Sequence, residues 1–91
     1  EDKLNAFADL LDKTGLEAQQ VCYAGDDWID IPVLLRVGLA VSVADADKLV
    51  QQHAHWITER KGGDAAVREI CNLILEAQGK DQTILDEILA L

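Results

Sequence analysis

Three carboxylates, Asp26, Asp27 and Asp30, lie within five residues of one another, directly after the short apolar run at residues 21–24. In open α/β sheets, ligands bind at the carboxyl ends of strands, where this loop is expected. Clustered anions repel one another unless a cation neutralises them, and hard oxygen ligands favour Mg²⁺ or Ca²⁺ over Zn²⁺. The spacing therefore indicates a divalent-cation site. A simpler interpretation also stands, in which Asp30 caps a helix and the other two carboxylates are solvated.

A single lysine, Lys3, stands at the start of the segment that leads into this strand. Residues 3–14 have helical periodicity, with Leu4, Phe7 and Leu11 on one face. A lysine at a helix start is more often a surface residue than a functional one. Its significance here depends on the acidic loop to which the same helix and strand lead.

The elements that must position these groups alternate between helix and strand. After the first helix and the strand at 21–24, the pattern predicts a short helix around Pro32 that ends near Arg36 and is capped by Asp30 or Ile31. A strand at 39–43 follows, and then a helix at about 46–53 with Asp45 and Asp47 as capping candidates. The remaining predicted elements are a short strand at 56–58, a helix capped by Asp64 that runs to about 78, and a last amphipathic segment at 84–89. This order predicts an α/β fold, a Rossmann-like parallel sheet with helices on both faces.

The strand at 21–24 has no polar alternation, which is typical of a strand buried on both faces. Because two or three strands make a poor sheet by themselves, we expect an interior strand that lacks a neighbour. The chain also contains no methionine. Together these features predict a partial sheet, half of a larger domain.

The composition bounds the class of protein. The 91 residues allow one small domain, and 49% hydrophobic with only 4% aromatic residues predicts an aliphatic core. The net charge of −9 disfavours nucleic acids and anionic membranes. Cys22 and Cys71 lie in apolar runs and are predicted to be buried free thiols, which suits a reducing cytoplasm. No signal peptide or membrane-spanning stretch is recognisable.

Gly25, Asp26 and Asp30 form G-D-x-x-x-D after an apolar strand, which resembles motif IV of the haloacid dehalogenase superfamily, and Lys3 stands where that superfamily places its motif III lysine. The segments K-L-x-A-F-x-x-L-L, V-x-Y-x-G-D-D-x-x-D-x-P-V and V-G-L-A-V-x-V-A-D-A narrow the resemblance to the 3-deoxy-D-manno-octulosonate 8-phosphate phosphatase family, over residues 2–80. One departure is Ala65, where that family usually has glycine.

The resemblance implies Mg²⁺-dependent hydrolysis of a sugar-acid phosphate in lipopolysaccharide precursor synthesis. Asp26 would bind Mg²⁺ directly, Asp27 and Asp30 would hold its waters and orient Lys3, and Lys3 would offset charge on the nucleophile and the phosphoryl group. The family's motif I aspartates and motif II Ser/Thr are absent from these 91 residues. The chain is therefore expected to be the C-terminal half of a phosphatase core at residues 1–80, with a helical tail at 81–91, and to be inactive without its N-terminal half.

The resemblance also implies a cytoplasmic homotetramer, in which Arg68 either reaches a substrate carboxylate or pairs with a glutamate on its own helix. His53 and His55 are expected to point apart and to bind no metal. Trp28 either rims the substrate entrance or packs against a subunit.

A non-catalytic alternative is a phosphatase-like oligomerisation domain of a sugar-acid cytidylyltransferase. A response-regulator receiver is disfavoured because its lysine follows the acidic residues, whereas Lys3 precedes them.

Overall fold

The computed structural model describes residues 3–90, which alternate between helices and strands as the sequence predicts. The elements are α1 (Lys3–Thr14), η1 (Ala18–Gln20), β1 (Cys22–Gly25), η2 (Trp28–Asp30), α2 (Ile31–Leu34), β2 (Leu39–Ser42), α3 (Lys48–Gln52), β3 (Trp56–Ile57), α4 (Ala66–Ala77) and α5 (Asp81–Leu89).

The three strands form a parallel sheet in the order β1-β2-β3, which confirms the α/β class. Within the described residues β1 pairs only with β2, so it is an edge strand. This position agrees with the expectation of a strand that lacks a neighbour, whereas the prediction that the strand is buried on both faces is wrong for this chain. Cys22 and Tyr23 are half-buried, Ala24 is exposed, and only Gly25 is buried, because no described element covers the outer edge of β1.

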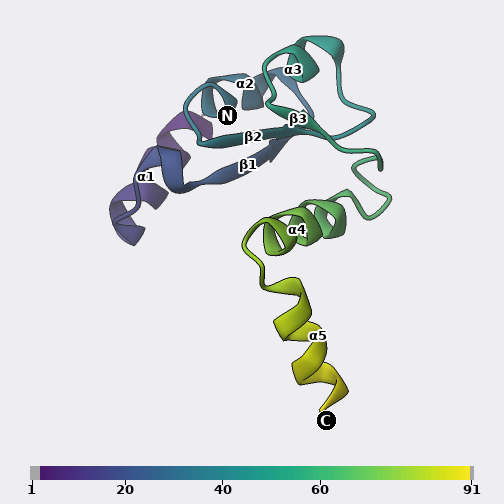
Figure 1. Cartoon of the computed structure of the whole chain (residues 1–91). Helices are drawn as coiled ribbons and strands as arrows, with labels where there is room; N and C mark the ends of the chain where they lie inside the picture. The colour runs from purple at the N-terminus through teal and green to yellow at the C-terminus, as the bar shows by residue number, and fades with distance from the viewer. Residues whose placement is uncertain (1–2, 91) are drawn as a thin grey trace.

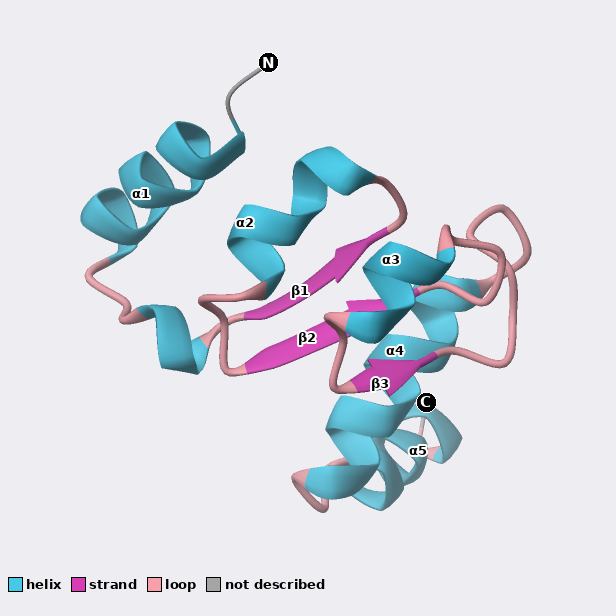
Figure 2. Cartoon of the chain, turned by 90° about the horizontal axis from the view of Figure 1, so that it is seen from above, coloured by secondary structure: helices cyan, strands magenta, loops and turns pink. Residues whose placement is uncertain are grey.

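Helices lie on both sides of the sheet. Figure 1 shows α2 and α3 above the strands and α4 below them, and Figure 2 shows the same arrangement from above. The core lies on the α1, α2 and α3 side, where it consists of Phe7, Val33, Leu34, Val37, Ala40 and Val50. The opposite side is thinner, because α4 buries only Ala66 and Ile70 and α5 extends away from the sheet (Figure 1).

Two predicted helix starts differ from the structure. Asp64 does not cap α4. The N-cap of α4 is Ala65, which has a left-handed φ of 66° and makes no side-chain capping bond. Ala65 is also the position where the similar family usually has glycine. Glycine adopts a left-handed φ without strain. In α3, Asp47 is the cap and accepts a hydrogen bond from Leu49 N at 2.8 Å. Asp45 instead accepts from Gly62 N at 2.9 Å, so the helix begins only at Lys48.

Both cysteines are free thiols, but the prediction that both are buried is wrong, because Cys71 is exposed and Cys22 is only half-buried. Cys71 is exposed because α4 buries only Ala66 and Ile70. Cys22 is half-buried, and its pKa is raised by burial and by the nearby Cys71. Among residues 3–90, no helix has the length and hydrophobicity needed to cross a membrane.

Candidate functional site

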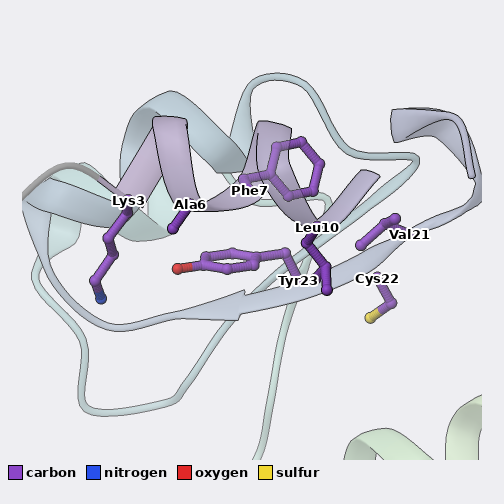
Figure 3. Close-up of a pocket in the computed structure, with 7 residues that line it drawn as sticks. All are labelled: Lys3, Ala6, Phe7, Leu10, Val21, Cys22 and Tyr23. Carbon is purple, nitrogen blue, oxygen red and sulfur yellow. The ribbon is translucent and has the colours of Figure 1, made fainter. Parts of the chain in front are cut away.

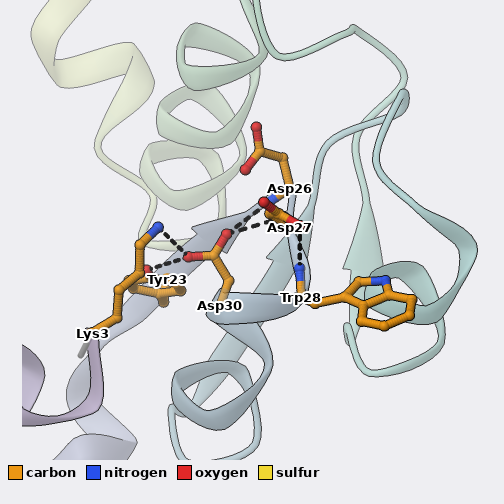
Figure 4. Close-up of polar contacts among 6 residues, drawn as sticks. All are labelled: Lys3, Tyr23, Asp26, Asp27, Trp28 and Asp30. Atoms are coloured by element: carbon orange, nitrogen blue, oxygen red, sulfur yellow. Dashed lines mark hydrogen bonds and ion pairs between the residues drawn. The ribbon is translucent and has the colours of Figure 1, made fainter. Parts of the chain in front are cut away.

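The centre of the site is the carboxylate of Asp30, a residue that is only 2% exposed. Its Oδ1 accepts hydrogen bonds from Lys3 Nζ and from the Tyr23 hydroxyl, each at 2.7 Å. Its Oδ2 accepts from the backbone N–H groups of Asp26 at 3.0 Å and Asp27 at 3.2 Å. Figure 4 shows these donors converging on Asp30 from α1, β1 and the loop after β1. The predicted pairing of Lys3 with the acidic loop is therefore present, and its partner is Asp30.

Local sequence explains why Asp30 turns back toward the strand. Asp27 caps η2 by accepting a hydrogen bond from Trp28 N at 2.7 Å, while Asp30 closes the reciprocal half of the capping box. This single turn carries the Asp30 side chain over Gly25. A Cβ atom at Gly25 would lie 2.6 Å from Asp30 Cβ, so the glycine of the motif is required by space. Asp30 also precedes α2 as its N-cap, but without a side-chain capping bond.

Burial on its own raises the pKa of Asp30, because it disfavours the charged form. The hydrogen bonds from Lys3, Tyr23 and the two backbone N–H groups outweigh burial and lower the pKa from 3.8 to about 2. Asp30 is therefore a carboxylate at neutral pH, and the pair with Lys3 is a full salt bridge. The Lys3 side chain is 31% exposed, whereas its partner Asp30 is 2% exposed.

Tyr23 is the site residue that the sequence analysis did not identify. Burial and the bond to Asp30 raise its pKa from 10.0 to about 12, so the phenol stays protonated and acts as the donor. One signal was available in the sequence. Tyr23 is the only tyrosine of the chain and stands in an otherwise apolar strand, where a buried hydroxyl needs a partner.

Asp26 and Asp27 behave differently from Asp30. Both are exposed, and the carboxylate of Asp26 has no hydrogen bond or ion pair within residues 3–90 (Figure 4 shows it directed away from Asp30). The carboxylate of Asp27 is engaged by Trp28 N. In the part of the chain that the structure describes, no three His, Cys, Asp or Glu side chains are grouped to hold a metal ion. The donor set fits a hard cation through one available carboxylate, Asp26, with its other ligands from elsewhere.

A pocket of about 300 Å³ borders the site along the edge of β1. It is lined by Lys3, Ala6, Phe7, Leu10, Val21, Cys22 and Tyr23. Figure 3 shows the Lys3 ammonium group and the Tyr23 hydroxyl at one end of this pocket, with Val21 and Cys22 at the other. The pocket is thus mostly apolar, with its polar groups at the carboxyl end of the strand.

The two histidines point apart, as expected. The ring of His53 bonds Leu49 O at 2.8 Å, whereas Nδ1 of His55 accepts from Ala40 N at 2.8 Å. Each imidazole ring therefore makes a hydrogen bond to a backbone group.

Two further predicted residues lie outside the network. The Trp28 indole is 59% exposed and turns away from Asp30 (Figure 4). It lies beside Asp47, whose pKa is lowered by Leu49 N–H and by the indole. Arg68 is exposed and makes no ion pair with any residue from 3 to 90, so the alternative in which it pairs with a glutamate of its helix is not seen.

Comparison with known proteins gives consistent matches. A family model described as haloacid dehalogenase-like hydrolase matches residues 1–70. The 3-deoxy-D-manno-octulosonate 8-phosphate phosphatase KdsC of Escherichia coli K12 is 52% identical over 79 residues, which are 87% of this chain and 42% of that protein. The chain thus spans less than half the length of this curated relative.

Two solved structures extend the comparison. A probable yrbi family phosphatase from Pseudomonas syringae is 46% identical with a TM-score of 0.92, and the match covers 97% of this chain and 50% of that one. The 3-deoxy-D-manno-octulosonate 8-phosphate phosphatase from Moraxella catarrhalis, solved with magnesium, phosphate and KDO, is 34% identical with a TM-score of 0.91. That match covers 96% of this chain and 50% of the other.

Proposed function

This chain belongs to the haloacid dehalogenase-like hydrolase family, and we propose from that premise that it forms the lysine–aspartate half of a phosphatase site for a sugar-acid phosphate. The observation that carries the proposal is the 2.7 Å salt bridge between Lys3 and the buried Asp30 at the carboxyl end of β1. A fixed ammonium group at this position can stabilise negative charge on a transferring phosphoryl group.

The residues of this chain have separate roles in the proposal. Asp30 holds Lys3, and Lys3 offsets charge on the phosphoryl group. Asp26 offers its carboxylate to Mg²⁺, while Asp27 caps η2 and fixes the loop that presents Asp26. When bound, the cation shields phosphate charge from an attacking anion.

These 91 residues contain no D-x-D that is followed by Gly and Thr. In this proposal the nucleophile therefore belongs to a segment outside them. We therefore expect the isolated chain to be inactive.

The substrate class rests on the relatives. KdsC of Escherichia coli is named for 3-deoxy-D-manno-octulosonate 8-phosphate, and the Moraxella catarrhalis structure holds magnesium, phosphate and KDO. We propose the same substrate here, in a cytoplasmic homotetramer. In this proposal residues 1–80 form the C-terminal half of the phosphatase core and 81–91 a helical tail. We also propose that Arg68 contacts a carboxylate of the substrate. The support for this contact is the exposure of Arg68 alone.

The test is hydrolysis of 3-deoxy-D-manno-octulosonate 8-phosphate by the full-length protein that carries this chain. Lys3→Met removes the ammonium group and should lower kcat by roughly 100-fold, as for the loss of one preorganised electrostatic group. Lys13→Met, at the exposed end of the same helix, is the matched control and should leave kcat unchanged.

A second arm tests the metal. Asp26→Asn removes one charged ligand and should raise the Mg²⁺ concentration needed for half-maximal activity, with the fold intact. Wild-type rates in Lys3→Met, or an unchanged Mg²⁺ requirement in Asp26→Asn, would contradict the assigned roles.

A further inference from the structure

We propose that Tyr23 is a positioning residue for the Lys3–Asp30 pair, because its hydroxyl fixes the orientation of the Asp30 carboxylate that holds the ammonium group. The inference rests on the proposed function in that it gives the pair a catalytic purpose. Tyr23 acts through Asp30, with which it shares a 2.7 Å hydrogen bond.

The Asp30 carboxylate is saturated with hydrogen bonds. A carboxylate offers about four lone-pair sites, and here four donors occupy them, two on each oxygen. The donors on Oδ2 are backbone N–H groups of the acidic loop. On Oδ1 the donors are the Lys3 ammonium group and the Tyr23 hydroxyl, and only Tyr23 comes from the sheet.

The origin of each donor decides which one can fix the carboxylate. Lysine carries a compact charge on a flexible stem, so a bond to Lys3 alone does not define an orientation. Tyr23 is anchored on β1, where its backbone lies opposite Ala40 of β2, and its ring lines the pocket beside Ala6 and Leu10 (Figure 3). Its phenol also remains a donor across the neutral range, because its pKa is raised to about 12. Tyr23 therefore connects Oδ1 to the hydrogen-bonded backbone of the sheet.

Loss of this tie has a specific kinetic consequence. A preorganised charge stabilises the transition state only while it stays in place. If the Asp30 carboxylate gains conformational freedom, the ammonium group of Lys3 is no longer held in one position. The Tyr23 hydroxyl bonds the Asp30 carboxylate and not the Asp26 side chain, so the change removes no proposed ligand of the cation. Tyr23→Phe, which keeps the ring and removes the hydroxyl, should therefore lower kcat about tenfold while KM and the Mg²⁺ requirement stay within about twofold.

The experiment measures kcat, KM and Mg²⁺ half-saturation for wild type, Tyr23→Phe and Val50→Ala in the full-length protein. Val50 is fully buried in the core on α3 and outside the Asp30 network, so Val50→Ala is a control for lost stability. It should lower the melting temperature and leave kcat at 25 °C unchanged. The inference is overturned if Tyr23→Phe keeps wild-type kcat, if KM rises in proportion, or if Val50→Ala reduces kcat equally.

A readout that needs no substrate separates this inference from the proposed function. Hydrogen exchange at the amides of Asp26 and Asp27 reports how firmly Asp30 accepts their bonds. In Tyr23→Phe these amides should exchange several-fold faster, whereas Val50→Ala should leave them as in wild type. If the wild-type protein does not hydrolyse the sugar-acid phosphate, the proposed function fails, but unchanged exchange in Tyr23→Phe is what removes the positioning role.

Discussion

Gly25→Ala places a single methyl group where the site has no room for it. The added Cβ would lie 2.6 Å from Cβ, 3.0 Å from Cγ and 3.1 Å from Oδ2 of Asp30. Carbon atoms pack at about 3.5–4.0 Å, so relief of this contact requires a displacement of roughly 1 Å. Asp30 is buried and held by four hydrogen bonds, so it cannot yield without lengthening some of them.

The magnitude follows from those bonds. A displacement of this size takes bonds of 2.7–3.2 Å beyond hydrogen-bonding range. A hydrogen bond to a charged group contributes about 1.5–3 kcal/mol, and overpacking a buried site costs about 1–3 kcal/mol. Because the structure can relax in part, we expect Gly25→Ala to destabilise the fold by about 3 kcal/mol. That is a large fraction of the stability of a small domain.

Urea denaturation of wild type, Gly25→Ala and Gly63→Ala measures this difference. Gly63 is the matched control, because a Cβ atom there meets nothing within 4 Å and its φ is not in the left-handed region. Gly63→Ala should be neutral or slightly stabilising. A loss below about 1 kcal/mol in Gly25→Ala, or an equal loss in Gly63→Ala, would refute the argument that Asp30 is locked against Gly25.

Two further predictions concern stability. The pKa of Asp30 is lowered from 3.8 to about 2 on folding, so its charged form contributes about 2 kcal/mol that is present above pH 3.8 and lost as the pH falls toward 2; urea denaturation between pH 7 and pH 2 should show this loss, and Asp30→Asn should remove that part of the pH dependence. Ala65→Gly should raise the free energy of unfolding by about 1 kcal/mol, because a left-handed φ of 66° strains alanine, and a lower melting temperature in this variant would show that the turn carries no such strain.

Much of the fold follows from local patterns in the sequence. The glycines and apolar runs place β1 and β2 within one residue of their observed bounds, and the helical stripe of α1 is where Phe7 enters the core. The wrong predictions share a different cause. Asp64 has the right chemistry for a cap, but the turn puts Ala65 at that position. Cys71 lies in an apolar run, but its burial depends on what covers α4.

The candidate site divides in the same way. The sequence alone determined the residue types, namely a strand that ends in Gly25, an acidic loop, and a lysine at the start of the preceding helix. Which carboxylate meets Lys3 depended on the tertiary structure. Asp27 caps η2, and this one turn swings Asp30 back over Gly25, where Lys3 and Tyr23 meet the same oxygen from separate elements. Spacing cannot reveal this choice, because a carboxylate four residues along a loop can face solvent or the strand, and the space above Gly25 decides which.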